Sequence, residues 1–147
     1  MIQKVNFKKL DARAVAPKYG SAAAAGADLY AILDEPLTLA PGQTTLVHTG
    51  LAVELPAGFV GLVCARSGLA TKRGLAPANK VGVVDADYRG ELMVALHNHG
   101  AEAQTIDHGE RVAQFMIVPY LTADYVEVDE LSDTVRGEGG FGSTGTK

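Results

Sequence analysis

Apolar and polar residues alternate along most of the chain in short runs, and glycine, proline or aspartate separates one run from the next. Over residues 3–10, Val5 and Phe7 alternate with polar neighbours, an apolar run over 59–64 follows a Pro-Ala-Gly turn, and the last run covers 125–128. Short strand-like runs at such spacing are typical of β-sandwiches, jelly rolls and barrels. The pattern therefore predicts an all-β fold of one of these kinds.

Two pairs of neighbouring runs look like β-hairpins. In residues 37–53, a Pro-Gly pair supplies a turn between two apolar stretches. In residues 81–96, a β-branched run stops at Asp85, and a second apolar run begins after Gly90. Because strand-like runs joined by a short turn segment favour pairing with each other, we predict a hairpin in each region.

The polar tip of the second predicted hairpin carries more functional groups than a turn requires. Residues 85–90 supply two carboxylates, a phenol and a guanidinium, whereas a turn needs only polarity and a glycine. A solvated turn can have this composition, and so can a site for a phosphorylated ligand. The segment alone leaves both interpretations open.

One short helix is predicted directly after the strand over residues 59–64. Ser67 lies near its start, and Gly74 closes it. A serine at this position can act as an ordinary N-cap, or it can bind an anion together with free backbone N–H groups. Arg66, immediately before the serine, favours the anion.

The end of the chain turns polar and then rich in glycine. We therefore expect a β domain over residues 1–131 and a flexible arm over residues 132–147. Phe141 is a lone aromatic among glycines, and Ser143 and Thr144 supply hydroxyls. A glycine-rich backbone exposes N–H groups that can cradle phosphate, although the spacing is not that of a P-loop. The arm is either a plain tail or a flap that closes over a ligand.

The composition narrows the class of protein. The 147 residues are 47% hydrophobic, which indicates a single globular domain with a proper core. No apolar run approaches the roughly 18 residues of a membrane span, and the first residues lack the apolar core of a secretory signal. A single cysteine, Cys64, is expected in the core and fits a reducing cytoplasm. The net charge of −4 argues against a general nucleic-acid binder.

His97 and His99 lie on one face of a predicted strand, as metal ligands can. Zinc sites need three or four ligands, and no cluster of cysteines or histidines lies near these two in the sequence. We therefore expect no zinc site there.

Five segments in order resemble the trimeric deoxyuridine triphosphatase (dUTPase) family. They are AGADLYA (25–31), ARSGLA (65–70), GVVDADYRGE (82–91), GERVAQ (109–114) and RGEGGFGSTG (136–145). Each would be weak alone, but the five in this order are highly specific. Ala65 departs from the pattern, since the family usually has proline there, and should alter only the stiffness of the turn.

The resemblance implies a jelly-roll or distorted β-barrel subunit with at most one short helix. It implies a homotrimer with active sites at the subunit interfaces, and no nucleic-acid or membrane partner. The implied reaction is hydrolysis of dUTP to dUMP and pyrophosphate by attack of water on the α-phosphate, with Mg²⁺ bound to the triphosphate. Such a reaction removes dUTP from the DNA precursor pool and supplies dUMP for thymidylate synthesis.

The nucleoside side of the implied site comes from the third segment and the residues just before it. By position, Asp85 would activate the attacking water and contact the deoxyribose 3′-OH. Tyr88 would lie against the deoxyribose and exclude a ribose 2′-OH. Asn79 and the backbone near Val81 and Gly82 would read the uracil edge.

The phosphate side of the implied site comes from three other segments. Phosphoanhydride hydrolysis needs charge neutralisation and alignment more than a protein nucleophile. By position, the residues expected to hold phosphate oxygens are Ser67, Gly68 and Gln114, with Arg66 and Arg136 at the γ end.

The resemblance also assigns the metal contact and the arm. Asp28 would act on Mg²⁺ at second shell, through metal-bound water. Phe141 would stack on the uracil, and Gly142, Ser143 and Thr144 would close over the phosphates.

Two alternatives stay open beside this interpretation. A dCTP deaminase shares the fold, but we would expect a catalytic glutamate in place of Asp85 and no phenylalanine-bearing glycine arm. A non-enzymatic β-sandwich module would use the hairpin and the arm to contact another protein. Products formed from dUTP and dCTP with Mg²⁺ would separate the three.

Overall fold

The computed structural model of the chain describes residues 3–140. These residues form eleven strands and one helix, which confirms the all-β class. In chain order, the elements are β1 (Asn6–Lys9), β2 (Lys18–Tyr19), β3 (Ala27–Tyr30), β4 (Leu37–Leu39), β5 (Thr44–Glu54), β6 (Phe59–Cys64), α1 (Ser67–Arg73), β7 (Leu75–Pro77), β8 (Val81–Val84), β9 (Glu91–Asn98), β10 (Gln104–Ile106) and β11 (Arg111–Pro119).

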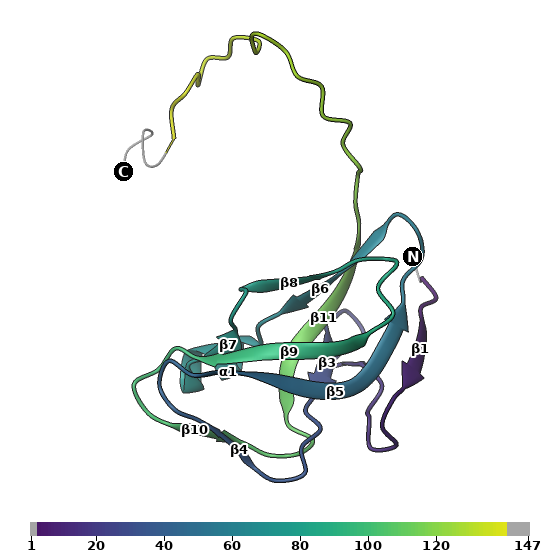
Figure 1. Ribbon diagram of the computed structural model, residues 1–147, viewed down its shortest axis with the longest axis vertical. Helices are drawn as coiled ribbons and strands as arrows, with labels where there is room; N and C mark the ends of the chain where they lie inside the picture. Colours follow the sequence, from purple (N-terminus) through teal and green to yellow (C-terminus); the bar gives the residue numbers. More distant parts are fainter. Residues whose placement is uncertain (1–2, 141–147) are drawn as a thin grey trace.

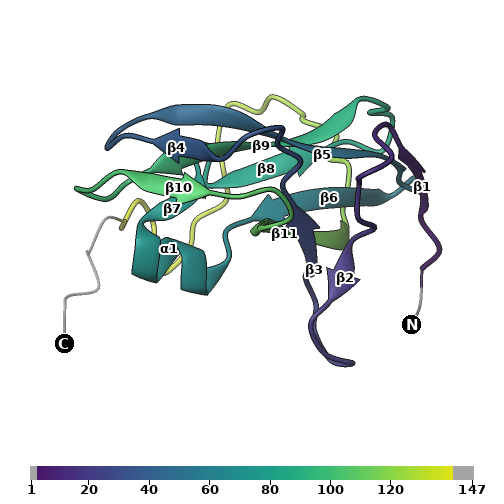
Figure 2. The same ribbon diagram turned by 90° about the horizontal axis from the view of Figure 1, so that it is seen from below.

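Two antiparallel sheets face each other. One has the strand order β1-β5-β9-β7 and the other β2-β3-β11-β6-β8, while β10 and β4 form a separate short pair. Figure 1 shows β9 and β5 crossing in front of β6 and β11, and Figure 2 shows α1 at one end of the layers beside β7. Apolar residues from both sheets form a single core, including Leu29, Leu51, Leu96 and Val112. This is the jelly-roll type of subunit that the resemblance implies.

The predicted hairpin over residues 81–96 is wrong in its pairing. β8 pairs with β6 in one sheet, while β9 pairs with β5 and β7 in the other. The two runs are strands, but the segment between them crosses from one sheet to the other. Apolar alternation indicates that a strand exists, and it does not identify the neighbour. We call residues 81–96 the arch.

The predicted hairpin over residues 37–53 and the predicted strand over residues 125–128 are also wrong. The Pro-Gly turn at residues 41–42 is present, but β4 pairs with β10, and β5 pairs with β1 and β9. Residues 125–128 form no strand and are exposed. A strand needs a partner for its backbone groups, and this subunit offers none there within residues 3–140.

The predicted short helix is confirmed. α1 starts at Ser67, and Gly74 ends it in the left-handed conformation at φ 65°, with its N–H bonded to the carbonyl of Ala70. A Cβ at this glycine would come within 2.8 Å of the backbone nitrogen of Gly100, so both the φ angle and the space require glycine. Arg73 of α1 forms an ion pair of 2.6 Å with Glu110, which holds the helix beside the start of β11.

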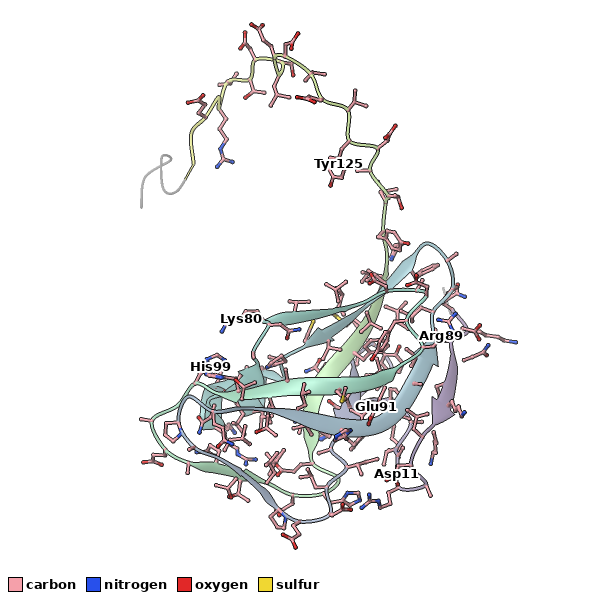
Figure 3. All side chains as sticks on the ribbon, in the orientation of Figure 1. Asp11, Lys80, Arg89, Glu91, His99 and Tyr125 are labelled. Atoms are coloured by element: carbon pink, nitrogen blue, oxygen red, sulfur yellow. The ribbon has the colours of Figure 1, made fainter. Side chains whose placement is uncertain are left out.

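After β11 the chain leaves the sheets. Residues 120–140 contain no strand or helix, and Figure 1 shows them arching away from the β domain. Tyr125, labelled in Figure 3, is 94% exposed, far from the packed core. Other large apolar side chains of this segment are also exposed: Leu121, Val126, Val128, Leu131 and Val135. No helix among the described residues is long and apolar enough to cross a membrane.

Candidate active site

A cavity of about 290 Å³ lies between the two strands of the arch. Four residues expected on the nucleoside side of a site reach its wall, namely Asn79, Gly82, Asp85 and Tyr88. The remaining wall is mainly apolar and consists of Leu46, Val63, Pro77, Val83, Val84, Glu91, Leu92, Met93, Val94 and Ala95. A flat, partly apolar ligand with a polar edge would suit such a hollow.

The cavity exists because the two sheets part at the arch. β8 pairs with β6 along one edge, and within residues 3–140 it has no partner strand along the other. An unpaired strand edge presents backbone N–H and C=O groups in fixed positions. Gly82, in the middle of β8, leaves the backbone accessible on the cavity wall, because it carries no side chain. Val81 lies in the same strand but is not part of the wall.

The turn before β8 holds Asn79 in place. Lys80 has φ 65° and is the one non-glycine residue with a positive φ within the described part of the chain. The N–H of Val81 bonds to the carbonyl of Asn79 at 2.7 Å, which makes the turn tight. The side-chain nitrogen of Asn79 would lie 3.2 Å from a Cβ at Gly82, so the amide lies close to the backbone of β8 at that residue. A strained conformation of this kind is often found at a functional site.

The other end of the arch carries Asp85 and Tyr88. The N–H of Tyr88 bonds to the carbonyl of Asp85 at 3.1 Å and closes a turn, with the Asp85 side chain exposed. The Tyr88 hydroxyl donates to the carbonyl of Glu91 at 3.0 Å, so the ring folds back over Gly90. A Cβ at Gly90 would collide with that hydroxyl. Figure 3 shows Lys80 and Arg89 at opposite ends of the arch.

A second cluster, which we call the arginine cluster, gathers Asp28, Arg66 and Arg111. Nε of Arg66 donates to Oδ1 of Asp28 at 2.8 Å, and Nη1 of Arg111 donates to Oδ2 at 3.2 Å. Arg66 also reaches the carbonyl of Arg111 at 3.3 Å. Asp28 is buried in β3, with 8% of its surface exposed, so both arginines are oriented by a carboxylate that is itself fixed.

Ser67, Gly68 and Gln114 lie close to the arginine cluster along the chain. Gln114 is paired with Asp28 on one side and Cys64 on the other, in the centre of its sheet. Ser67 begins α1 directly after Arg66, which takes the N-cap position in an extended conformation without a side-chain capping bond. The hydroxyl of Ser67 is therefore not used as an N-cap, which removes the ordinary interpretation of this serine.

Asp85 and Arg66 are far apart within one chain. β8 runs antiparallel to β6, and Val81 at its start pairs with Cys64 at the end of β6. Asp85 follows the far end of β8, whereas Arg66 follows the near end of β6. About six residues of strand separate them, or roughly 20 Å at about 3.3 Å per residue. One subunit cannot place both side chains on neighbouring phosphates of a single ligand.

The remaining predicted residues join neither group. Arg136 lies in the segment beyond β11, where its Nε bonds to the carbonyl of Gly139 at 2.7 Å. The predicted contacts at Phe141, Gly142, Ser143 and Thr144 lie outside the described residues, and their roles stay predictions.

The described residues offer no ready-made metal cage. Within residues 3–140, no group of three or more His, Cys, Asp or Glu side chains could hold an ion. His97 bonds to the Thr44 hydroxyl at 2.7 Å. Burial, with Lys80 and His97 nearby, lowers the pKa of His99 below its ordinary value.

Mg²⁺ would fit beside the arginine cluster only if phosphate groups of a ligand also held it. Mg²⁺ is commonly held by one or two carboxylates together with substrate phosphates and water. Both oxygens of Asp28 already accept bonds from arginines, but each keeps a lone pair that can accept from a metal-bound water. The donor set therefore suits an ion that arrives with its ligand.

Sequence reasoning overlooked three residues of these groups. Arg111 and Glu91 lie inside two of the quoted segments. The residue type alone does not show which carboxylate or backbone group each side chain contacts. Lys80 carries the strained φ, and its only local signal is the Ala-Asn-Lys turn before a β-branched run.

All the comparisons with known proteins find dUTPases. The dUTPase family profile matches residues 12–145. A deoxyuridine 5′-triphosphate nucleotidohydrolase of Desulfitobacterium hafniense is 49% identical over 143 residues, which cover 97% of this chain and 95% of that protein.

Two solved structures are similar as well. The dUTPase of Staphylococcus bacteriophage 80alpha, solved with dUPNHPP, is 30% identical with a TM-score of 0.89, and covers 98% of this chain and 99% of its own. A mutant dUTPase from phage phi11 of S. aureus, described as revealing the coordination of a structural Mg(II) ion, is 25% identical with a TM-score of 0.80. That match covers 89% of this chain and 100% of the other.

Proposed function

The chain belongs to the dUTPase family and hydrolyses dUTP to dUMP and pyrophosphate, and we propose that its active sites form between the subunits of a homotrimer. The observation that carries this proposal is the wide separation of Asp85 from Arg66 along β8 and β6. An arch from one subunit facing an arginine cluster from the next would bring the two together. The deaminase and interaction-module alternatives are set aside by the family match.

The arch would hold the nucleoside. Uracil would enter the cavity with its polar edge against the free edge of β8 and the amide of Asn79. Backbone groups in a strand cannot rotate to suit another base, so a mismatched edge would leave buried polar groups unpaired. Mismatches of this kind are rejected by about 10⁴–10⁵. Tyr88, folded over Gly90, would pack against the deoxyribose and leave no room for a 2′-OH.

The arginine cluster would hold the triphosphate. Arg66 keeps Nη2 for a ligand, because its Nε and Nη1 bond within the protein. Ser67, Gly68 and Gln114 would bind phosphate oxygens beside it. Charge-assisted hydrogen bonds from a guanidinium are about twice as strong as neutral ones. Arg136 would approach the γ end from the segment beyond β11.

Asp85 would act as the general base. Its exposed position at the end of β8 allows a water molecule to sit between the carboxylate and the α-phosphate. The carboxylate would accept a proton from that water as the oxygen attacks, and pyrophosphate would leave from the opposite side. The same carboxylate would orient the sugar through the 3′-OH. Bound Mg²⁺ would neutralise charge on the phosphates and leaving group, with Asp28 bonded to its water.

The segment beyond β11 supports the assembly. Its apolar side chains, such as Leu121 at 97% and Tyr125 at 94% exposed, are too many for a chain that stays in water. Contact with a neighbouring subunit would cover them. Such a path would also deliver Arg136 and the glycine-rich arm to a site that other subunits build.

Product analysis tests the reaction. We expect pyrophosphate from dUTP in the presence of Mg²⁺, strong loss of turnover with excess EDTA, and no ammonia from dCTP. Native mass spectrometry should give the mass of three chains. Ammonia from dCTP without pyrophosphate from dUTP would contradict the proposed reaction, and an active monomer would contradict the proposed assembly.

A further inference from the structure

β5 and β9 lose their regular register beside the arch. His48 is opposite Met93 and Ala52 is opposite Glu91, so three residues of β5 face a single residue of β9. Gly50, within this bulge, has φ 65°, and a Cβ there would collide with Ile32. The bulge leaves backbone N–H groups of β5 without ladder partners, and they need another acceptor.

The Glu91 carboxylate supplies that acceptor. Oε1 accepts from the N–H of Gly50 at 2.7 Å, and Oε2 lies 2.8 Å from Nδ1 of His48. The side chain of Glu91 is 20% exposed, whereas that of His48 is 59% exposed. Figure 3 shows Glu91 at the start of β9, against β5. A single carboxylate thus joins the two strands where their ladder is interrupted.

The side chain of Tyr88 is hydrogen-bonded to the backbone of Glu91. The Tyr88 hydroxyl bonds to the Glu91 carbonyl, so the backbone position of Glu91 sets the position of the ring. Glu91 belongs to the wall of the arch cavity and also to the wall of a second cavity of about 280 Å³ on its other side. The residues of that second wall are Leu10, Asp11, Arg13, Ile32, Asp34, His48 and Gly50.

We propose that Glu91 is a positioning residue for dUTP hydrolysis, which holds the C-terminal strand of the arch against the β5 bulge and so fixes Tyr88 and Asp85. The proposal rests on the function given above for these two residues. Glu91 acts on the sugar side of the site only. The free edge of β8 and Asn79 are held by β6 and by the Lys80 turn, and do not depend on Glu91.

The charges around Glu91 favour its ionised form. Burial raises the pKa of the carboxyl, but the bonds from His48 and from the Gly50 N–H outweigh it and leave the pKa below its ordinary value. Arg13, across the second cavity, is engaged by Asp11 and Asp34, both at 2.8 Å. Glu91 therefore stays committed to the bulge at neutral pH.

Steady-state kinetics with dUTP and UTP test the proposal. In Glu91→Ala, we expect kcat for dUTP to fall about tenfold, since a small displacement of catalytic groups costs up to 10²-fold. We expect KM for dUTP to stay within about threefold, because the uracil contacts remain. The ratio of kcat/KM for dUTP over UTP should fall about tenfold, as the Tyr88 ring no longer has a fixed position. Glu91→Gln keeps an acceptor for the Gly50 N–H and should restore most of the ratio.

Glu110→Ala is the matched control. Glu110 also bonds one oxygen to a cationic side chain, that of Arg73, and the other to a backbone N–H, that of Asp107. Its removal should lower Tm and leave the dUTP/UTP ratio at the wild-type value. A ratio that falls equally in both variants would mean general loosening and would contradict the proposal.

A folded Glu91→Ala variant with wild-type kcat and wild-type ratio would overturn the proposal. If that variant fails to fold, Glu91→Asp takes its place, since it keeps the charge and withdraws the carboxylate by one methylene. An unchanged ratio in folded Glu91→Asp would then overturn it. A wild-type enzyme that hydrolyses UTP as readily as dUTP would instead contradict the role proposed for Tyr88, which is a separate failure.

Discussion

The arch cavity and the arginine cluster each contain a key aspartate, and the two aspartates have opposite surroundings. Asp28 is buried, and its oxygens hold Arg66 and Arg111 at 2.8 and 3.2 Å. Asp85 is exposed at the end of β8, beside a mainly apolar hollow. Both oxygens of Asp28 are occupied by hydrogen bonds from guanidinium groups, whereas the exposed carboxylate of Asp85 leaves room for a water molecule beside it.

The difference indicates that the arch and the arginine cluster have separate roles. The arginine cluster is organised without a ligand, since Asp28 holds both arginines in a fixed arrangement, and one positive charge remains over for phosphate. The arch provides a cavity and a free strand edge, and the carboxylate of Asp85 is exposed at the end of β8. For the proposed reaction, neither region alone would be a complete site, because phosphate binding and proton abstraction must act on the same molecule.

We expect the largest effect on turnover from replacement of Asp85. Asp85→Asn keeps size and polarity and removes the base, so kcat should fall by about 10²–10⁴ while dUTP binding is largely kept. Turnover and equilibrium binding of a non-hydrolysable analogue would check this. Asp87→Asn, in the same exposed turn, is the control and should stay near wild type. Near-normal turnover of Asp85→Asn would refute the assignment.

Removal of the arm should give the next largest effect. Truncation after Asp133 takes away Arg136, Phe141 and the hydroxyls, and none of the strands of the β domain. Loss of base stacking, worth about 1–3 kcal/mol, together with lost γ-phosphate contacts should lower kcat/KM about 10²-fold with Tm nearly unchanged. Truncation after Gly145 is the control. A protein shortened at Asp133 that turns over dUTP normally, or that no longer folds, would count against a closing arm.

Arg66→Ala tests the phosphate contacts proposed for the arginine cluster. Hydrogen bonds to charged groups are worth about 1.5–3 kcal/mol, so kcat/KM should fall roughly 10- to 100-fold. Asp28 keeps Arg111, so the protein should still fold. Arg13→Ala, which removes an arginine from a carboxylate pair outside the site, should leave kinetics unchanged. If Arg66→Ala bound dUTP as tightly as wild type, phosphate recognition would have to lie elsewhere.

The smallest effect concerns acid stability. The pKa of Glu91 is lower in the folded protein than its ordinary value of 4.5, so the stabilisation is present above that pH and is lost as pH falls through the lowered pKa. Wild-type Tm should therefore drop more steeply below about pH 4.5 than that of Glu91→Gln. Thermal unfolding from pH 7 to 3 would measure it. Parallel curves would show that Glu91 has no such linkage.

Local chemistry was predictable from the sequence to a large extent. The helix Ser67–Arg73 ends at Gly74, because only a glycine tolerates the φ angle and the close neighbour at that position. Many strand positions follow from apolar alternation, although the run at 125–128 forms no strand. Several wall residues of the arch cavity, such as Gly82, Asp85 and Tyr88, lie in a family segment. These signals depend on neighbours in sequence, which a single chain displays.

Strand partners were not predictable in the same way. The arch was expected to be a hairpin, because nothing in residues 81–96 shows that β8 joins β6 and β9 joins β5. The arch cavity follows from that split, so its origin cannot be read from the sequence, although four of its wall residues were named: Asn79, Gly82, Asp85 and Tyr88. The contacts of Arg111 and Glu91 also join distant segments, and pairings of this kind depend on the whole fold.

Mixing two defective variants tests the shared site most directly. Arg66→Ala and Asp85→Asn would be co-refolded in equal amounts, which gives roughly three quarters mixed rings in a cyclic trimer. In either kind of mixed ring, one interface in three pairs an intact Arg66 with an intact Asp85, so activity should recover to roughly a quarter of wild type. If each chain built its own site, mixing would add nothing. Activity no higher than the mean of the two variants, with mixed trimers confirmed by native mass spectrometry, would contradict sites shared between subunits.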